Sequence, residues 1–533
     1  MHEAAVNDFR SFAGPRPWTI LLAGSLLGGL CALYFGFQPE WDMLNYHLYD
    51  PHAWLSGRAA IDVAPAQMQS YFNPLFHVPH YLAFRYLPTW VLVFVTGAVQ
   101  GSQLLLLYLV LKQMLGSKRL PAWMLLTVAL LGMGGPVFLG ELGSTHGDTV
   151  LSMFVLGGLW LILHSARCET PNQTTVRTAA SGALLGMATA LKLVFALYAI
   201  GLGAALLIAC PGGERWRTCF IWAGGFALGF LLLGGFWFTY LYAHYQNPFF
   251  PYFNEFFQSP LITAESFRDL RFMPTSLTDW LAYPFVWLVN PLRVWELPFR
   301  DLRVVALYPL LLVLPICCWR RLAGEARALR LVLVFLLLSY LVWLMMFSIY
   351  RYLAVVEMLA PLVLFTVVVN FIHSRRVQVT GLLLLLCTQW FVDFQRPVAM
   401  PELQADSPST LQSLPPDALV LINSLEPLGF VALWLDDDIP MVRTRANFMR
   451  QQTPPSSLRI EAEQRVRTHI GPVFLLNSVK GLNAEFLEAD LARMGLVLDY
   501  PGACEPLFMQ QSLQDKTEIV VCALSRSGIA AIQ

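Results

Sequence analysis

Charged residues are scarce in this sequence. Only 13% of its 533 residues are Asp, Glu, Lys or Arg, whereas a soluble domain averages about 25%. Hydrophobic residues make up 56% of the chain, so much of its surface is expected to face lipid rather than water. The formal net charge is zero, which removes the bulk electrostatic basis for binding nucleic acid.

Several common signatures are also missing. The sequence has no P-loop, dinucleotide fingerprint or nucleophile elbow in the required context, and its histidines lack tight zinc spacing. No long internal repeat is evident, which weakens a transporter built from inverted halves. The first apolar run lacks a short core followed by a cleavage site, so we expect a retained transmembrane helix.

The nine cysteines have no metal-ligand spacing. Most lie in or beside apolar runs, which is typical of small buried hydrophobic residues. Cys504 and Cys522 fall in the last segment, where an oxidising periplasm would allow them to pair. Sequence does not supply the separation that a disulfide requires, so this pairing stays open.

Long apolar runs dominate the first three quarters of the chain. The run 178–210 is too long for one span, and Lys192 interrupts it, so two short helices are expected to meet there. We predict an α-helical polytopic membrane protein with about eleven transmembrane helices. The runs of spanning or near-spanning length lie at 18–37, 89–111, 121–139, 149–164, 178–210, 218–240, 303–319, 329–349, 352–372 and 377–394.

Lys and Arg in the short loops predict the orientation. One set of loops is rich in them and is assigned to the cytoplasm together with the N-terminus. An odd number of spans then places the C-terminal segment in the periplasm. The cytoplasmic set contains Arg10, Arg16, Lys112, Lys118, Arg119, Arg167, Arg177, Arg215, Arg217, Arg320, Arg321, Arg327, Arg330, Arg375 and Arg376.

Two domains are expected. Residues 1–394 form a transmembrane domain with large outer loops at 38–88 and 241–300. Residues 395–533 have ordinary soluble composition, with apolar strands at 418–422 and 518–523 and an amphipathic helix at 483–493. They are predicted to form a small periplasmic α/β domain.

The densest polar stretch, 40–58, begins where the first helix leaves the bilayer. Asp42, Asn45 and Tyr46 share one side if the helical turn continues. A carboxylate at this boundary is costly against lipid, so Asp42 is expected to face a wet cavity. The alternative is a structural role, as a helix-end cap or an ion pair with Arg58.

The outer loop 140–148 holds two acids and a histidine, which are Glu141, Asp148 and His146. Asp148 is expected in the first turn of the following helix, where the positive helix end favours an acid. That capping role is as good an account as a functional one.

Two cations, Lys192 and Arg351, fall on the outer side, where the charge rule disfavours them. A phosphate is a natural partner, especially for the planar guanidinium. The alternatives are a lysine that reaches toward the interface and an ion pair of Arg351 with Glu357.

Several short motifs follow one another on the predicted outer side. They are Trp41-Asp42, Asn45-Tyr46, Leu55–Arg58, Gly147–Leu151, Asn247–Asn254 and Arg351-Tyr352 with Pro361. Their order and common side resemble those of the GT-C superfamily of membrane glycosyltransferases, which includes protein O-mannosyltransferases and lipid A aminoarabinose transferases. Many relatives have Asp-Glu in the first loop, whereas Met43 follows Asp42 here, which weakens a paired acidic metal site.

The resemblance implies an inverting, single-displacement transfer of sugar from a polyprenyl-phosphate donor to a lipid, glycan or protein acceptor. It would occur at the outer face of a bacterial inner membrane. Asp42 would be the general base, Asp148 would position acceptor or a metal, and Lys192, Arg351 and Tyr352 would bind the donor phosphate. No cofactor is required, although Mg²⁺ or Mn²⁺ on the two aspartates stays open. Sugar or acceptor contacts are assigned to Trp41, Asn45, Tyr46, His47, Glu141 and His146.

Three rival functions remain. A lipid or polysaccharide transporter or flippase would need charged or broken helices near the bilayer midplane, whereas the polar residues here gather at the outer boundary. A polymerase-type assembly protein shares large outer loops. A purely structural scaffold leaves the ordered acids and cations without a role.

Overall fold

The computed structural model describes residues 15–118, 120–165, 170–209, 213–320, 322, 326–396, 408–449, 455–499, 502–511 and 516–527. The chain forms two compact units. The helical unit contains Met1–Gly36, Val93–Gly235 and Asp269–Arg396, and the α/β unit contains Phe37–Leu92, Phe236–Arg268 and Pro397–Gln533. The α/β unit therefore includes all of the first long loop, 38–88, and slightly less than half of the second, 241–300, both of which the sequence assigned to the transmembrane domain.

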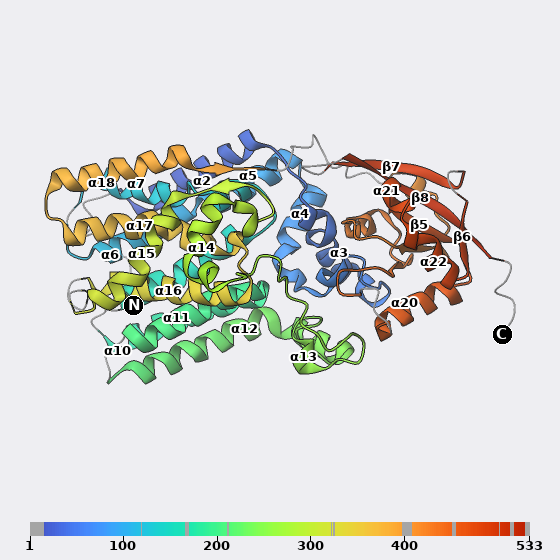
Figure 1. Cartoon of the computed structure of the whole chain (residues 1–533), viewed down its shortest axis with the longest axis horizontal. Helices are drawn as coiled ribbons and strands as arrows, with labels where there is room; N and C mark the ends of the chain where they lie inside the picture. Colours follow the sequence, from blue (N-terminus) through green and yellow to red (C-terminus); the bar gives the residue numbers. More distant parts are fainter. Residues whose placement is uncertain are drawn as a thin grey trace. The chain divides into compact units, whose positions relative to one another are not determined.

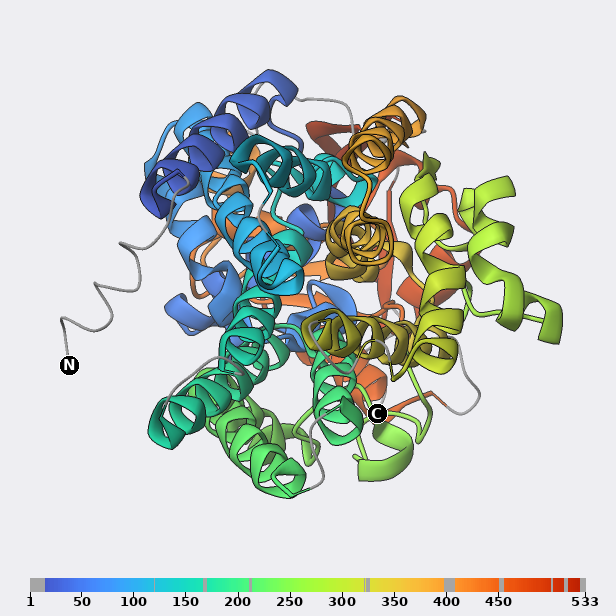
Figure 2. The same ribbon diagram turned by 90° about the vertical axis from the view of Figure 1, so that its left-hand side faces the viewer.

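Helices occupy every predicted apolar run, and Figure 2 shows many of those in the helical unit nearly end-on. Two short strands, β1 (Phe299–Arg300) and β2 (Asp393–Phe394), pair antiparallel in this unit. Its helices are α2 (Pro17–Phe35), α5 (Thr89–Gly101), α6 (Gln103–Leu115), α7 (Ala122–Gly132), α8 (Pro136–Glu141), α9 (Asp148–Ser165), α10 (Pro171–Leu191), α11 (Ala196–Ala209), α12 (Arg215–Tyr245), α14 (Leu277–Val289), α15 (Leu302–Cys317), α16 (Arg327–Met346), α17 (Ala354–Phe371) and α18 (Arg375–Thr388).

Six described helical segments are long and apolar enough to cross a membrane. The helices at 122–132, 193–209 and 302–317 are apolar but shorter. These lengths support a polytopic membrane protein, and the total of about eleven crossings stays a prediction. The six segments are Pro17–Phe35, Thr89–Leu115, Asp148–Ser165, Arg215–Tyr245, Arg327–Met346 and Tyr350–Phe371.

Glycine pairs four residues apart let neighbouring helices approach closely. A Cβ atom on Gly182 or Gly186 of α10 would collide with the backbone of α12, and one on Gly225 or Gly229 of α12 would collide with α10. Such small-residue contacts are a main source of helix association in lipid, where hydrophobic burial contributes little. The same arrangement joins α2 to α5 through Gly24, Gly28, Gly97 and Gly101.

The α/β unit is built on a mixed six-stranded sheet (Figure 1). The strand β3 is parallel to both of its neighbours, β4 and β5. The longest strand, β8, is antiparallel to β5, β6 and β7. The strands are β3 (Leu419–Ile422), β4 (Met441–Arg443), β5 (Val473–Ser478), β6 (Leu496–Leu498), β7 (Cys504–Gln511) and β8 (Lys516–Arg526).

Helices from three separate stretches complete this unit. Val63 of the first loop adds a parallel bridge to Val442 on β4, and its core combines side chains such as Tyr71, Trp237 and Leu419. The helices are η1 (Met43–His47), α3 (Tyr49–Ser56), η2 (Arg58–Ala60), η3 (Gln67–Tyr71), η4 (Pro74–His77), α4 (Val78–Tyr86), α13 (Asn254–Phe257), α19 (Ser409–Gln412), η10 (Gly429–Trp434), α20 (Ser457–Thr468), α21 (Val479–Leu482) and α22 (Glu485–Arg493).

Two buried arginines tie the first loop to the sheet. Arg58 forms an ion pair with Asp62, with 3.2 Å between Nη2 and Oδ1, and donates to the carbonyls of Asp436 at 2.8 Å and Ile439 at 2.7 Å. Arg443 of β4 donates to the Pro65 carbonyl at 2.9 Å. Because a buried guanidinium is costly without acceptors, these contacts make the loop an integral part of the unit.

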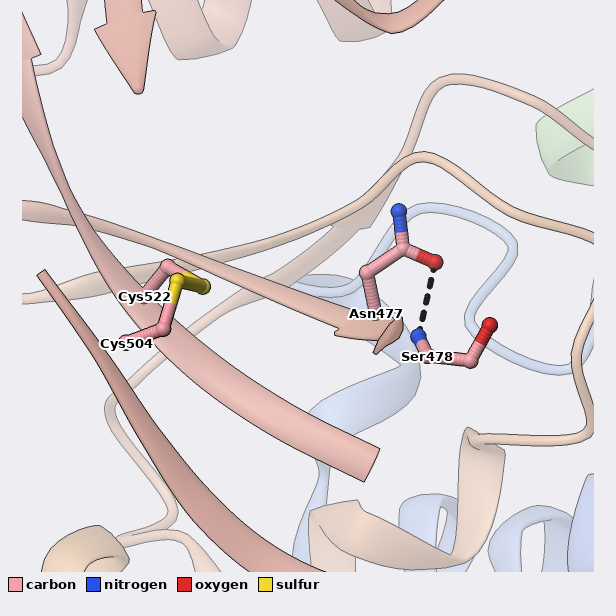
Figure 3. Close-up of a disulfide and its surroundings, with 4 residues drawn as sticks. All are labelled: Asn477, Ser478, Cys504 and Cys522. Atoms are coloured by element: carbon pink, nitrogen blue, oxygen red, sulfur yellow. Dashed lines mark hydrogen bonds between the residues drawn. A yellow bond between two sulfur atoms is a disulfide. The ribbon is translucent and has the colours of Figure 1, made fainter. Parts of the chain in front are cut away.

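A disulfide joins Cys504 on β7 to Cys522 on β8 (Figure 3). The two residues face each other in the antiparallel register, with 4.0 Å between their Cα atoms. The bond cross-links the last two strands of the chain, and it resolves a pairing that the sequence leaves open. Asn477 and Ser478, drawn beside it, end the neighbouring strand β5.

Candidate functional site

Lys192 lies at the break between α10 and α11. The residue is extended, with φ −149° and ψ 105°, and the short helix η5 (Leu193–Phe195) follows it. The charge that interrupts the apolar run therefore does mark a helix boundary. Because the backbone leaves the helix here, the lysine side chain can reach a neighbouring loop.

That loop supplies Asp148. The Nζ of Lys192 lies 2.5 Å from Oδ1 of Asp148 and 3.1 Å from the carbonyl oxygen of His146. Asp148 is fully buried, while the Lys192 side chain is 19% exposed. Among the described residues, no hydrogen-bond partner reaches Oδ2 of Asp148. The Lys192 ammonium group therefore stays in contact with solvent, and Oδ2 of Asp148 has no hydrogen-bond partner among the described residues.

The local sequence explains where Asp148 sits. Gly147 has a left-handed φ of 80°, which turns the chain into α9, and Asp148 occupies the first turn of that helix. The predicted capping position is confirmed. The carboxylate also pairs with a lysine 44 residues away, which no local pattern indicates.

Glu141 lies buried close to Asp148. Its Oε2 accepts a hydrogen bond from the Thr149 amide at 3.1 Å. Burial, with the nearby negative charge of Asp148, raises the pKa of Glu141 above its ordinary value. The raised pKa favours the protonated form of the Glu141 carboxyl group. His146 completes the loop, with Nδ1 lying 3.1 Å from Oγ of Ser144.

Arg351 and Tyr352 lie on the short helix η8 (Tyr350–Leu353), directly before α17. The Tyr352 ring is close to two cations, with its centroid 5.6 Å from Nζ of Lys192 and 5.3 Å from Cζ of Arg351. Distances of this size allow cation–π attraction. Tyr352 thus brings together two cations that are far apart in the sequence.

Tyr198 of α11 holds η8 in place, a role that no local sequence pattern indicates. Its hydroxyl donates to the Tyr352 carbonyl at 2.6 Å and accepts from the Val355 amide at 3.2 Å. Glu357, the rival partner suggested for Arg351, accepts from the amides of Val137 at 3.1 Å and Phe138 at 3.2 Å.

The other predicted site residues belong to the α/β unit. Asp42 is half-buried and directly precedes the π-helix η1, a local form that is frequent at functional sites. Trp41 is 42% exposed, whereas Asn45, Tyr46 and His47 are buried. The sequence suggested an ion pair between Asp42 and Arg58. In the structure Arg58 instead forms its ion pair with Asp62.

The buried members of η1 pack within their own unit. Asn45 donates to the Ala66 carbonyl at 3.0 Å. The His47 ring stacks on His77 with 3.9 Å between centroids, and Tyr46 packs edge-on against Phe72. These contacts fix the segment that carries Asp42.

Asp50 is a residue that the sequence did not single out. It is buried, and among the described residues neither carboxylate oxygen has a hydrogen-bond partner. Burial raises its pKa well above the ordinary value. Its Tyr-Asp-Pro context resembles that of any helix start, so sequence alone contained no signal for this environment.

The site residues thus form two groups. Glu141, His146, Asp148, Lys192, Arg351 and Tyr352 lie in the helical unit, and Trp41, Asp42, Asn45, Tyr46 and His47 lie in the α/β unit. Within the described ranges, no three His, Cys, Asp or Glu side chains gather in a way that could hold a metal ion.

The long apolar helices support a polytopic membrane protein. Two solved structures of ArnT from Cupriavidus metallidurans are similar to it. ArnT bound to undecaprenyl phosphate matches with a TM-score of 0.51 and 14% identity, over 94% of this chain and 97% of that one. ArnT in the apo state matches with a TM-score of 0.52 and 15% identity, over the same shares.

At this level of identity the similarity concerns the fold. No family model matches the sequence, and no curated protein does. The similarity to the two ArnT structures covers almost the whole chain.

Proposed function

We propose that this protein transfers a sugar from a polyprenyl-phosphate donor to an acceptor, by an inverting single displacement. The observation that carries the proposal is the cluster of Lys192, Asp148, Tyr352 and Arg351 within a fold shared with ArnT, a protein that has been solved bound to undecaprenyl phosphate. A polyprenyl-phosphate partner accounts for two outer-side cations in one place.

Lys192 and Arg351 bind the donor phosphate in this proposal. As the bond between the anomeric carbon and the phosphate oxygen breaks, negative charge grows on the leaving phosphate. Fixed cations stabilise that charge most effectively in a site that excludes water. The guanidinium can engage two phosphate oxygens at once, and the ammonium acts as a point charge.

Asp148 positions Lys192 rather than acting on the substrate. Its ion pair at 2.5 Å holds the ammonium group while leaving it partly exposed. Tyr352 and Tyr198 orient the second cation through the ring contact and the hydrogen bond to the η8 backbone. Glu141 and His146 complete the loop and contact sugar or acceptor.

Asp42 is the general base. It removes the proton from the acceptor hydroxyl while the new bond to the anomeric carbon forms, and polyprenyl phosphate leaves. A positioned base contributes about 10²–10⁴-fold in rate. Trp41 stacks on the apolar face of a sugar, and the buried side chains of Asn45, Tyr46 and His47 hold the segment around Asp42 in place.

The proposed location is a bacterial inner membrane, with the N-terminus cytoplasmic and the α/β unit periplasmic. The distribution of Lys and Arg supports this orientation. The disulfide between Cys504 and Cys522 also supports it, because such bonds persist in oxidising compartments. The acceptor is a lipid, glycan or protein that this face of the membrane offers.

Transfer by purified protein tests the proposal. Detergent-solubilised protein is incubated with defined polyprenyl-phosphate sugars and extracted envelope acceptors, and products are followed by mass spectrometry. Asp42→Asn is expected to lower the transfer rate by about 10²–10⁴-fold, while Asp438→Asn, which removes an exposed acid, leaves it unchanged. Full activity of Asp42→Asn would remove Asp42 as the base.

The products separate the rival functions. A transporter or flippase would yield no transferred sugar, and a polymerase-type protein would build products of many units from one donor.

Kinetic constants test the role of Arg351. Arg351→Ala is expected to raise the KM for donor more than the KM for acceptor, and the opposite pattern would reassign Arg351 to the acceptor.

A further inference from the structure

An open pocket of about 470 Å³ lies within the α/β unit. Helix α3 contributes His52 and Ser56, helix α4 contributes Arg85 and Tyr86, and Asp436 and Asp437 follow η10. Its volume falls in the range of about 300–1,000 Å³ typical of small-ligand sites. We infer that this pocket is a saccharide-binding site for neutral and amino sugars, distinct from the residues proposed for transfer.

One wall of the pocket is a fixed chain of hydrogen bonds. Arg85 Nη1 donates to the Tyr81 hydroxyl at 3.0 Å, which lies 3.0 Å from Nδ1 of His52. The other nitrogen of His52 is 3.2 Å from the Ala432 carbonyl. Burial lowers the pKa of His52 to about 4, so its neutral ring donates through Nε2 and accepts the Tyr81 proton at Nδ1.

The hydrogen-bonded wall leaves few polar groups free to contact a ligand. These groups carry opposite charges. Arg85 is exposed and keeps further N–H donors. The side chain of Asp437 is 63% exposed, and Asp436 is exposed beside it. The Arg58 hydrogen bond to the Asp436 carbonyl at 2.8 Å fixes the backbone at this point.

A sugar matches this combination of groups. Each hydroxyl both donates and accepts, so adjacent hydroxyls can pair with a carboxylate on one side and a guanidinium on the other. Leu55, Leu82 and Tyr86 are 52%, 41% and 71% exposed, and they offer apolar surface to the C–H face of a ring.

The charges decide which sugars fit. Two carboxylates face one guanidinium in the pocket, because His52 is neutral above its pKa of about 4. A phosphate or a uronic acid would meet net negative charge. An amino sugar would gain an ion pair with Asp436 or Asp437, so amino sugars should bind at least as tightly as neutral ones.

In the context of glycosyl transfer, this pocket would hold the saccharide part of the acceptor, and that identification of the ligand rests on the proposed function. Binding of sugar itself does not depend on it. Failure of one can therefore be told apart from failure of the other.

Direct binding tests the pocket. Full-length protein in a detergent without a sugar headgroup is titrated with glucose, galactose, mannose, their 2-amino derivatives and the uronic acids, and binding is measured by saturation-transfer NMR. Asp437→Asn and Arg85→Gln are each expected to weaken binding of the best neutral or amino sugar by about tenfold or more, because each loses a charge-assisted hydrogen bond. Asp438→Asn removes a neighbouring exposed acid outside the pocket and should leave binding unchanged.

Three outcomes would overturn the inference. These are no detectable binding of any of these sugars, preferred binding of the uronic acids, and unchanged binding in both pocket variants. Unchanged thermal midpoints in the exposed-site variants confirm that folding is intact. If sugars bind as expected but the wild type transfers nothing from any polyprenyl donor, the pocket stands and the proposed function falls; if transfer is intact but sugar binding is absent, the reverse holds.

Discussion

Lys192 and Asp148, 44 residues apart in the sequence, form an ion pair of 2.5 Å in which the carboxylate is fully buried and the ammonium is partly exposed. Because the two side chains differ in burial, loss of the partner has a different cost for each charge. The lysine could be solvated alone, whereas the aspartate would be left as an uncompensated charge.

Stability and activity should therefore separate at this pair. Lys192→Met is expected to lower the free energy of unfolding by about 3–5 kcal/mol, because it leaves Asp148 buried and unpaired. The double variant Lys192→Met/Asp148→Asn should recover most of that loss but none of the transfer activity. Thermal midpoints and transfer rates of the four proteins measure both effects. Equal destabilisation in the single and double variants would show that the pair is not energetically coupled.

Tyr198→Phe should weaken donor binding while the protein still folds. The change removes the hydroxyl that bonds the Tyr352 carbonyl and the Val355 amide, so η8 and its arginine lose a support worth about 1–3 kcal/mol. The expected result is a raised KM for donor with a smaller change in kcat.

Tyr340→Phe is the matched control. This hydroxyl on α16 is buried and has no hydrogen-bond partner among the described residues, so its loss should be neutral or mildly stabilising. A donor KM that rises equally in both variants would attribute the effect to general loss of a tyrosine hydroxyl.

The close approach of α10 and α12 makes Gly186→Ala costly. The new Cβ would collide with the backbone at Phe226 and Phe230, and forced displacement of packed elements typically costs about 1–3 kcal/mol. Gly224→Ala on α12 meets no atom within 4 Å and should be tolerated. Thermal midpoints in detergent compare the two, and equal tolerance would contradict the packing described for this helix pair.

Removing the disulfide should destabilise the α/β unit. It closes a loop with a sequence separation of 18, for which loss of the cross-link costs about 3 kcal/mol in the chain-entropy model. Cys504→Ser/Cys522→Ser should therefore unfold at a lower temperature than wild type, and a reducing agent should lower the midpoint of the wild type but not that of this double variant. Cys387→Ser changes an unpaired, exposed cysteine and serves as the control.

Acid should weaken the α/β unit through His52. Its pKa falls from 6.5 to about 4 on folding. Between these two pH values, His52 binds a proton in the unfolded chain but not in the folded protein. The contribution to stability is complete above pH 6.5 and declines by about 3 kcal/mol as the pH falls to 4. Thermal midpoints across this window should fall less steeply for His52→Gln than for wild type. The exposed residue His244 provides the control substitution His244→Gln, which should keep the wild-type slope.

Local features of the site were predictable. A lysine inside an apolar run indicated the break after Leu191, and an acid following a glycine indicated the first turn of α9. Both follow from chemistry within one or two turns of chain. The positions of the helices followed in the same way from the lengths of the apolar runs.

Partners distant in the sequence were not predictable. No local sequence pattern indicates that Lys192 is the counter-ion of Asp148, or that Tyr198 bonds to the η8 backbone. The sequence also contains no signal that the Asp50 carboxylate is buried without a hydrogen-bond partner among the described residues, because burial is a property of the assembled unit. The glycine pairs four residues apart in α10 and α12 were a readable signal of close helix contact.

The parallel bridge from Val63 to Val442 also imposes an order of assembly. Val63 enters the growing chain nearly four hundred positions before its partner on β4, and β8, which pairs with β5, β6 and β7, is made later still. The first loop segment is therefore expected to stay incompletely paired until these strands have been made. A gene fragment encoding the terminal sheet alone would lack an edge that the N-terminal third provides, so this unit is expected to mature only as part of the whole chain.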